Sequence, residues 1–250
     1  MTKKIKTAIW HEKSLEANPF APKESYLYGE NYFRNVVSNH TFTELSFFTV
    51  TGKKASPKQR KWFDVLLNLG ANPGIRDEST RAAMNCAVAK GPPINSLLVG
   101  LLARSGENRG GRWIEKVMDN LTKAFQDKTD LPDFAPFSGL GMHFGAPDQR
   151  AIAAVEFLTA KKYWGKYSEF LQKSAGKENP VLLEGIIAAG FLDIGLTPVQ
   201  GSLLFLFSSG PAYIAFALEQ WELGYKEFPA FFGEEGFSYN GPTSSSRETK

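Results

Sequence analysis

Cysteine and histidine are the scarce residues of this 250-residue chain, which has one cysteine, Cys86, and three histidines, His11, His40 and His143. One cysteine excludes an intramolecular disulfide and any zinc site built from several cysteines, and we expect no metal centre. Three histidines leave few candidates for imidazole acid–base chemistry. A chain of this length buries about 75 % of its unfolded surface. With 20 Phe, 8 Tyr and 5 Trp to bury, it is expected to fold without disulfide bonds or a structural metal.

An excess of charge is also nearly absent. The formal net charge is +3, and three lysines lie within the first six residues, so the rest of the chain is balanced. A nucleic-acid surface needs basic residues clustered on one face. We therefore expect no nucleic-acid partner.

A secretory signal is missing as well. Residues 1–10 are basic, but Ala8–Trp10 is followed at once by His11, Glu12 and Lys13, so no apolar core of a signal develops. We expect a cytoplasmic protein.

One long uncharged run is present, from Ile194 to Leu218. Its length would span a bilayer, but Pro, Ser, Thr, Gln and Gly interrupt it. The pattern favours two buried helices broken at Ser208–Pro211 and no membrane partner.

The remaining pattern is nearly all helical. Ser56-Pro57 is a typical helix start, with serine as the N-cap and proline in the first turn. Strand signals occur only at 45–50, which also fits a helix. Further helices are expected at residues 82–89, 94–103, 111–125, 147–162, 163–173, 181–192, 198–207 and 212–223.

Proline and glycine divide this helical pattern. The loop at 130–146 and the turn at 192–198 suggest a small helical domain, residues 137–195, inserted between two parts of a large one, residues 1–136 and 196–250. A cleft between two such bodies is a common ligand site.

Several motifs lie in a characteristic order along the chain. They are Thr7-Ala8-Ile9, Tyr28-Gly29, Phe42-Thr43-Glu44, Arg81-Ala82-Ala83, Gly110-Gly111, Gly139-Leu140-Gly141-Met142-His143-Phe144, Asp148-Gln149-Arg150-Ala151, Leu183-Glu184-Gly185 and Tyr213 to Gln220. Together they resemble the citrate synthase superfamily, most closely its short citryl-CoA lyase-like members. The resemblance extends over nearly the whole chain and implies the all-α, two-domain fold with a cleft.

The resemblance implies Claisen or retro-Claisen chemistry on a coenzyme A thioester. In that family a carboxylate moves a proton, histidines hold the oxygens of an oxo acid, and arginines bind carboxylates, which is consistent with tuned acids and bases and with guanidinium–carboxylate pairing. The expected ligands are therefore an acyl-CoA and a small oxo or hydroxy acid. Members generally form homo-oligomers, and the apolar helices at 80–103 could supply such an interface.

Carried over by position, the family's catalytic aspartate becomes Glu184, and its first substrate-binding histidine falls near Asn72. The histidine of the glycine loop becomes Met142 in a gapless alignment, or His143 after a one-residue slip. These correspondences predict Glu184, His143 and Asn72 as catalytic residues.

The substrate-binding candidates are Arg150, Arg109 and Ser209. Arg150 matches the family unchanged, whereas Arg109 replaces a histidine and Ser209 an arginine. The loss of an arginine at position 209 argues against citrate itself as the substrate, because burying a carboxylate without a cation is costly. The loop expected to contact coenzyme A comprises Gly139, Leu140, Gly141, Met142 and Phe144.

Each candidate also has an ordinary structural interpretation. Glu184 fits an exposed first-turn glutamate, His143 a surface-loop histidine and Arg150 a surface arginine. The basic cluster of Arg104, Arg109 and Arg112 fits either a site for coenzyme A phosphates or a substrate carboxylate, or a solvated helix end. Two functions stay open. One is a divergent lyase or synthase acting on an acyl-CoA. The other is an inactive homologue that binds a CoA thioester or serves as a regulatory or structural subunit.

Overall fold

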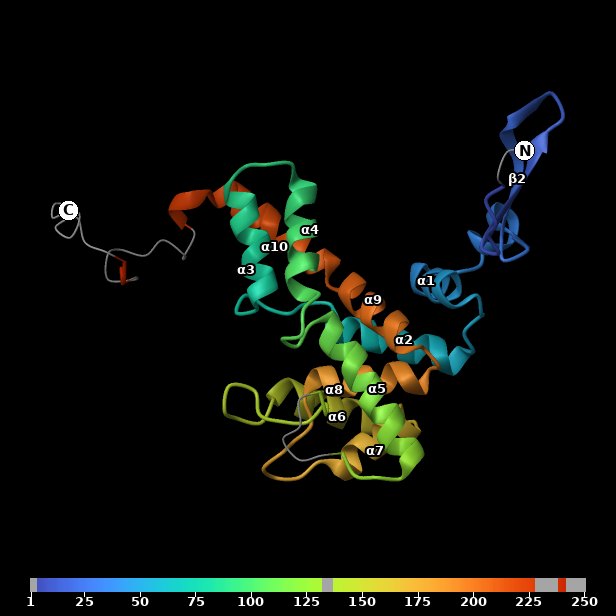
Figure 1. The fold of residues 1–250 in the computed structure, drawn as a ribbon. Coiled ribbons are helices and arrows are strands. Elements are labelled where there is room, and N and C mark those ends of the chain that lie inside the picture. Colours follow the sequence, from blue (N-terminus) through green and yellow to red (C-terminus); the bar gives the residue numbers. More distant parts are fainter. Residues whose placement is uncertain (1–3, 132–136, 228–237, 242–250) are drawn as a thin grey trace, which may run out of the picture.

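The computed structural model describes residues 4–131, 137–227 and 238–241. Ten α-helices form most of this part of the chain, and a small sheet lies at its N-terminal end (Figure 1). The helices are α1 Phe42–Thr51, α2 Pro57–Gly70, α3 Glu78–Val88, α4 Pro93–Arg104, α5 Gly111–Asp127, α6 Gln149–Lys161, α7 Lys166–Ser174, α8 Leu183–Asp193, α9 Pro198–Ser208 and α10 Gly210–Leu223.

The N-terminal sheet is the main departure from the expected all-helical pattern. Strands β1 Trp10–Leu15, β2 Asn18–Leu27 and β3 Glu30–Asn31 pair antiparallel in sequence order. The sheet stands away from the helices in Figure 1, and every residue of β1 is exposed. A strand exposed on both faces needs no apolar–polar alternation, so β1 carries no strand signal in its residues. Residues 45–50, the one ambiguous segment, lie in the helix α1.

Local capping explains where several helices begin. Thr41, Ser56 and Thr197 each accept a hydrogen bond from the third residue of the following helix, whose Glu or Gln side chain bonds back. This reciprocal pair satisfies backbone donors that the helix itself leaves free. Asp77 and Asp148 cap α3 and α6 through single bonds of the same kind.

Helix α8 lies at the centre of the largest hydrophobic core. Its first nine residues are all buried, and it packs against α2, α5, α6, α7 and α9. The predicted inward positions of α5, namely Trp113, Val117, Met118 and Leu121, are buried in the same core. In Figure 1, α5 to α8 gather at one end of the helical body and α3, α4 and α10 at the other.

The uncharged run forms α9 and α10, which follow each other with Ser209 between them. Among the described helices, Pro198–Leu223 is the one stretch long and apolar enough to cross a membrane. Half of its most apolar window is buried inside the protein. The expected break at Ser208–Pro211 coincides with the junction of the two helices.

The expected domain limits at 136/137 and 195/196 stay a prediction. Residues 132–136 and most of the segment after 227 lie outside the described residues. The described core is continuous across both limits, because α5 packs on α7 and α8, and α8 packs on α2 and α9.

The start of α8 lies directly against the glycine-rich loop. A Cβ at position 185 would collide with the carbonyl oxygen of Gly139, whose own φ is +84°. Backbone atoms cannot rotate away as a side-chain end can, so only glycine fits at position 185.

We predict that Gly185→Ala destabilises the protein by about 1–3 kcal/mol, the usual cost of overpacking. Chemical denaturation of both proteins measures this difference. Gly91→Ala is the matched control, because its Cβ would have an ordinary contact 3.8 Å from Asn95 Nδ2. Equal losses for the two variants would contradict the proposed backbone contact.

Candidate active site

Glu184 is a buried carboxylate in the first turn of α8, only 5 % exposed. This burial excludes the exposed first-turn glutamate that the sequence also allowed. The N-terminal end of a helix favours negative charge, which lowers part of the cost of burying the carboxylate. Nearby cations must offset the remaining cost of burial.

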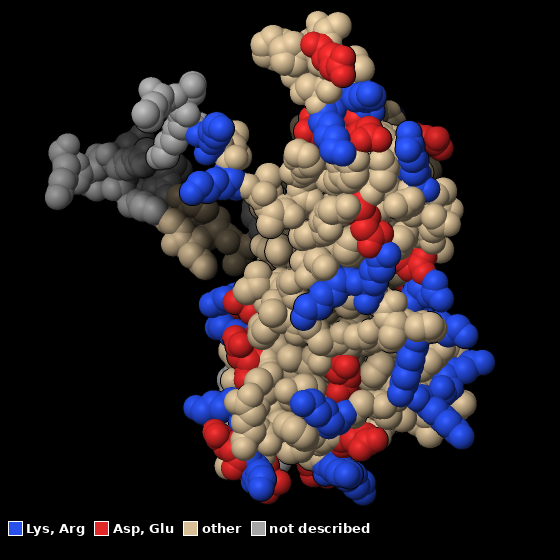
Figure 2. Space-filling view, turned by 90° about the vertical axis from the view of Figure 1, so that its right-hand side faces the viewer, with Lys and Arg blue, Asp and Glu red and all other residues tan. Residues whose placement is uncertain are grey.

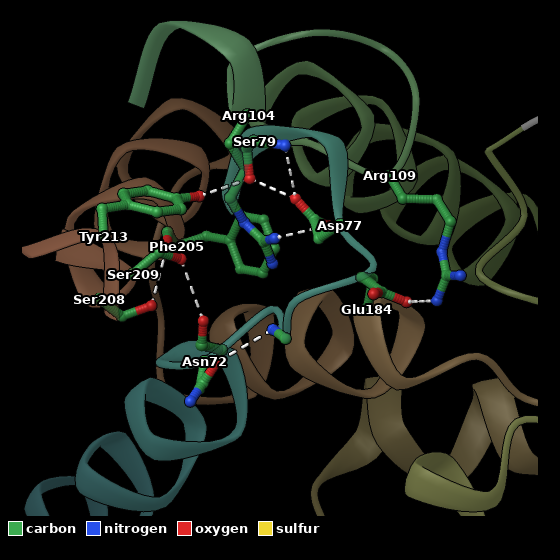
Figure 3. A network of polar contacts seen from close by, with 12 residues as sticks. Asn72, Asp77, Ser79, Arg104, Arg109, Glu184, Phe205, Ser208, Ser209 and Tyr213 are labelled. Atoms are coloured by element: carbon green, nitrogen blue, oxygen red, sulfur yellow. Dashed lines mark hydrogen bonds and ion pairs between the residues drawn. The ribbon is translucent and has the colours of Figure 1, made fainter. Parts of the chain in front are cut away.

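Two arginines supply those cations from other parts of the chain. Arg109 Nη2 lies 2.5 Å from Glu184 Oε2, and Arg150 Nη2 lies 3.6 Å from Glu184 Oε1. Figure 3 shows the Arg109–Glu184 pair, with Arg109 coming from the turn before α5. Two of the three predicted substrate-binding residues therefore contact the predicted catalytic carboxylate.

Asp148 completes this group, although it was not among the predicted site residues. It is 2 % exposed and accepts hydrogen bonds from Arg150 Nε at 2.9 Å and Arg150 Nη2 at 2.8 Å. Arg109 Nη2 lies 3.5 Å from the same carboxylate. Burial pushes the pKa of Asp148 up, but the hydrogen bonds and charge of Arg150 outweigh it and leave the pKa below its ordinary value. The Asp-x-Arg spacing was the available signal, because an N-cap aspartate can reach the arginine two residues later.

His143 belongs to the same group through Arg109. Its Nδ1 is hydrogen-bonded to Arg109 Nη1. A guanidinium only donates, so Nδ1 accepts and the ring proton of neutral His143 lies on Nε2. Burial, followed by the charges of Arg109 and Arg150, lowers the pKa of His143 below 6.5. At neutral pH this imidazole is therefore an uncharged hydrogen-bond donor.

The glycine loop is attached to the segment before α8. Gly141 N donates to Pro180 O at 2.7 Å, and Leu182 N donates to Gly139 O at 3.1 Å. Beyond this attachment the chain turns back, with His143 N donating to Ala146 O at 2.6 Å. Leu140 is buried, whereas Met142 is 38 % exposed and Phe144 is 83 % exposed.

This geometry bears on whether Met142 or His143 occupies the histidine position of the family loop. The side chain of His143 bonds the arginine that pairs with Glu184, whereas Met142 lies partly in solvent. The arrangement favours His143 over Met142 as the residue facing the carboxylate.

Two predicted site residues have other contacts. Asn72 is exposed, and its Oδ1 accepts from Gly74 N at 2.9 Å, so it stabilises its own turn. Ser209 is fully buried and donates to Gly70 O at 3.1 Å, which ties the α9–α10 junction to the end of α2. Neither forms a hydrogen bond with Glu184, Arg109 or Arg150 among the described residues.

A second polar network, which contains Arg104 of the predicted basic cluster, lies beside the first (Figure 3). Arg104 Nη1 lies 3.2 Å from Asp77 Oδ2, and Ser79 Oγ bonds both Asp77 and the hydroxyl of Tyr213. Burial raises the pKa of Tyr213 above its ordinary value, so this hydroxyl stays protonated. The signal that was available is a lone arginine at the end of the otherwise uncharged helix α4.

Two apolar cavities lie elsewhere. One of about 220 Å³ lies between α4 and α10, and one of about 440 Å³ lies among α1, α2, α4 and the α9–α10 junction. Neither is lined by Glu184, His143, Arg109 or Arg150. Within the described residues, no group of three His, Cys, Asp or Glu side chains is placed to hold a metal ion. The face in Figure 2 carries interspersed acidic and basic side chains rather than one basic patch.

The chain matches no sequence profile of a known family and no curated protein. Solved structures are similar to it. A citryl-CoA lyase from Hydrogenobacter thermophilus aligns with a TM-score of 0.79 at 20 % identity, over 96 % of both chains. An ATP citrate lyase from Methanothrix soehngenii, solved with citrate and coenzyme A, aligns with a TM-score of 0.75 at 15 % identity, over the whole of this chain and 44 % of its own.

A citrate synthase from Thermoplasma acidophilum aligns less closely, with a TM-score of 0.57 at 15 % identity, over 81 % of this chain and 57 % of its own. The described fold is therefore similar to the folds of these citryl-CoA lyase, ATP citrate lyase and citrate synthase structures, as the sequence motifs indicated.

We predict that Arg109→Met raises the pKa of His143, because the variant removes a cation that disfavours the imidazolium. Titration of the histidine ring signals by NMR measures the change. Arg112→Met is the control, since Arg112 is half exposed and pairs with Glu115. A His143 pKa equal to that of the native protein would show that Arg109 does not act on the imidazole.

Proposed function

We propose that this protein is a lyase or synthase that cleaves or forms a carbon–carbon bond on an acyl-CoA thioester. The observation that carries the proposal is the buried Glu184, paired with Arg109, with neutral His143 on the same arginine. A carboxylate and a neutral imidazole held on one guanidinium form an acid–base pair of fixed geometry. The citryl-CoA lyase-like fold supports the same chemistry.

In the cleavage direction, Glu184 takes the proton from the substrate hydroxyl. The bond between the hydroxyl-bearing carbon and the α-carbon of the thioester breaks, leaving an oxo acid and a thioester enolate. Neutral His143 donates a hydrogen bond from Nε2 to developing negative charge on oxygen. A proton then returns to the α-carbon, so the products are an oxo acid and a shorter acyl-CoA. Synthesis is the reverse sequence.

Residues of the loop suit a coenzyme A thioester. Gly139 and Gly141 have φ values of +84° and +140°, and a side chain at 141 would meet no atom closer than 3.7 Å, so the backbone there can be approached closely. The exposed side chains of Met142 and Phe144 offer apolar contact. Arg109 and the nearby Arg112 offer cations for phosphate groups.

The acid is proposed to be a small oxo or hydroxy acid other than citrate, because Ser209 and Asn72 replace polar family residues and have structural partners. These same two residues favour a second candidate. In it, the protein is an inactive homologue that binds a CoA thioester as a regulatory or structural subunit. A cytoplasmic location is proposed with either function.

We predict that the protein binds acetyl-CoA in calorimetric titration and cleaves members of a hydroxyacyl-CoA panel monitored by mass spectrometry. Glu184→Gln should lower turnover by about 10²–10⁴-fold, the usual contribution of general acid–base catalysis, and leave CoA affinity nearly unchanged. Glu178→Gln, at an exposed position, is the control. Binding without turnover in every protein would favour the inactive homologue, and absence of binding would oppose both candidates.

A homo-oligomer is also proposed. Ile94, Leu98 and Leu102 of α4 are 55 %, 49 % and 72 % exposed, and Leu203, Phe207, Ile214 and Leu218 of α9 and α10 are similarly uncovered. A soluble chain rarely leaves a large apolar patch exposed without a partner. We therefore propose that copies of the chain meet on this surface.

Leu98→Glu combined with Leu102→Glu should lower the oligomeric mass in sedimentation velocity, because burying two added carboxylates is unfavourable. Leu15→Glu, on the exposed strand β1, should leave the mass unchanged. A monomeric native protein would refute the proposed association.

A further inference from the structure

Arg104 is a buried cation that the proposed chemistry does not use. It lies in the last turn of α4, where it is the one charged residue of the helix, and it is 7 % exposed. Helix ends usually place arginine in solvent, where a charge costs little. Here the side chain turns inward, toward the α9–α10 junction (Figure 3).

The guanidinium of Arg104 has few partners for a buried charge. Asp77 Oδ2 lies 3.2 Å from Nη1, and the ring of Phe205 lies 4.4 Å from the guanidinium carbon. The buried Nε has no hydrogen-bond partner among the described residues. A guanidinium carries five N–H donors, and a buried charge is costly unless its hydrogen bonds are made. Arg104 therefore has donors left for an anion.

Asp77 is only a partial counter-ion. Its Oδ1 accepts from Ser79 N at 2.9 Å as the cap of α3, and it also bonds Ser79 Oγ. In Figure 3, Asp77 is drawn between Arg104 and the Arg109–Glu184 pair. Its charge also contributes to raising the pKa of Arg150, so one aspartate acts on two arginines.

The place of Arg104 is set by its contacts with α9 and α10. Phe205, which covers the guanidinium, lies one turn before Ser209. Tyr213 lies one turn after Ser209 and interacts electrostatically with Arg104. Helix α4 thus brings a cation to the junction where residue 209 is an uncharged serine.

We propose that Arg104 is a substrate-binding residue, which binds a carboxylate group of the small acid. Asp77 partly neutralises Arg104 until that carboxylate arrives. This inference rests on the proposed function for the identity of the acid, but the carboxylate site itself is testable without any thioester. The competing interpretation is an ion pair that only stabilises the fold.

Calorimetric titration with L-malate, a chemically stable hydroxy acid with two carboxylates, tests the proposal. Arg104→Met should weaken malate binding at least tenfold, and Arg104→Lys should weaken it less, because lysine keeps the charge but loses the planar set of donors. Arg60→Met is the matched control, since Arg60 pairs with Glu44 on α1, and it should bind malate as the native protein does.

Asp77→Asn keeps the test valid even when a variant of Arg104 fails to fold. Asparagine is as good an N-cap as aspartate, so α3 should persist. Removing the competing carboxylate should tighten malate binding several-fold. An ion pair with only a structural role predicts lower stability and no change in malate affinity.

The outcomes separate this inference from the proposed function. Native protein that does not bind malate, or malate affinity unchanged in both Arg104→Lys and Asp77→Asn, overturns the role of Arg104. Malate binding that depends on Arg104, without acetyl-CoA binding, supports the carboxylate site and opposes the thioester chemistry. Turnover that depends on Glu184, with malate affinity independent of Arg104 and Asp77, supports the chemistry and overturns the inference.

Discussion

The burial of Glu184 is the constraint on which the rest of the site depends. An isolated carboxylate in a protein interior is strongly disfavoured, and removing one partner of a buried pair leaves an uncompensated charge. Arg109 and Arg150 offset Glu184, and Asp148 in turn offsets both arginines. The two carboxylates and the two guanidinium groups therefore have no net charge together. The loop before α5, the start of α6 and the start of α8 must hold these four groups in place.

Much of the fold follows from the sequence, because helix caps and apolar periodicity are local signals. Ser56 begins a helix where its side chain predicts one, and Thr197 and Asp148 cap two further helices that the sequence pattern predicts. The N-terminal hairpin did not follow, because β1 buries no face and the two-residue turn at Glu16-Ala17 lacks glycine or asparagine. Nothing in the alternation of residues distinguishes β1 from a loop.

The candidate site was predictable only in part, for a related reason. Glu184, Arg150 and His143 were predicted because each lies in a short motif, and the structure brings them into one group. Asn72 and Ser209 were assigned by alignment alone, and their hydrogen bonds serve a turn and a helix junction. Alignment reports which position a residue occupies, whereas the direction of its side chain depends on tertiary packing. Arg104 was assigned only to a basic cluster with two possible roles, because its inward direction depends on a contact with Phe205, a hundred residues away.

The contact between Gly139 and Gly185 joins two parts of the candidate site. Because two backbone segments touch there, the base of the glycine loop and the start of α8 must move as one rigid piece. The loop beyond Gly141 is held by its own turn and by the hydrogen bond between His143 and Arg109, with Phe144 outside the core. The backbone contact therefore fixes the start of α8, which carries Glu184, and Arg109 fixes the side chain of His143.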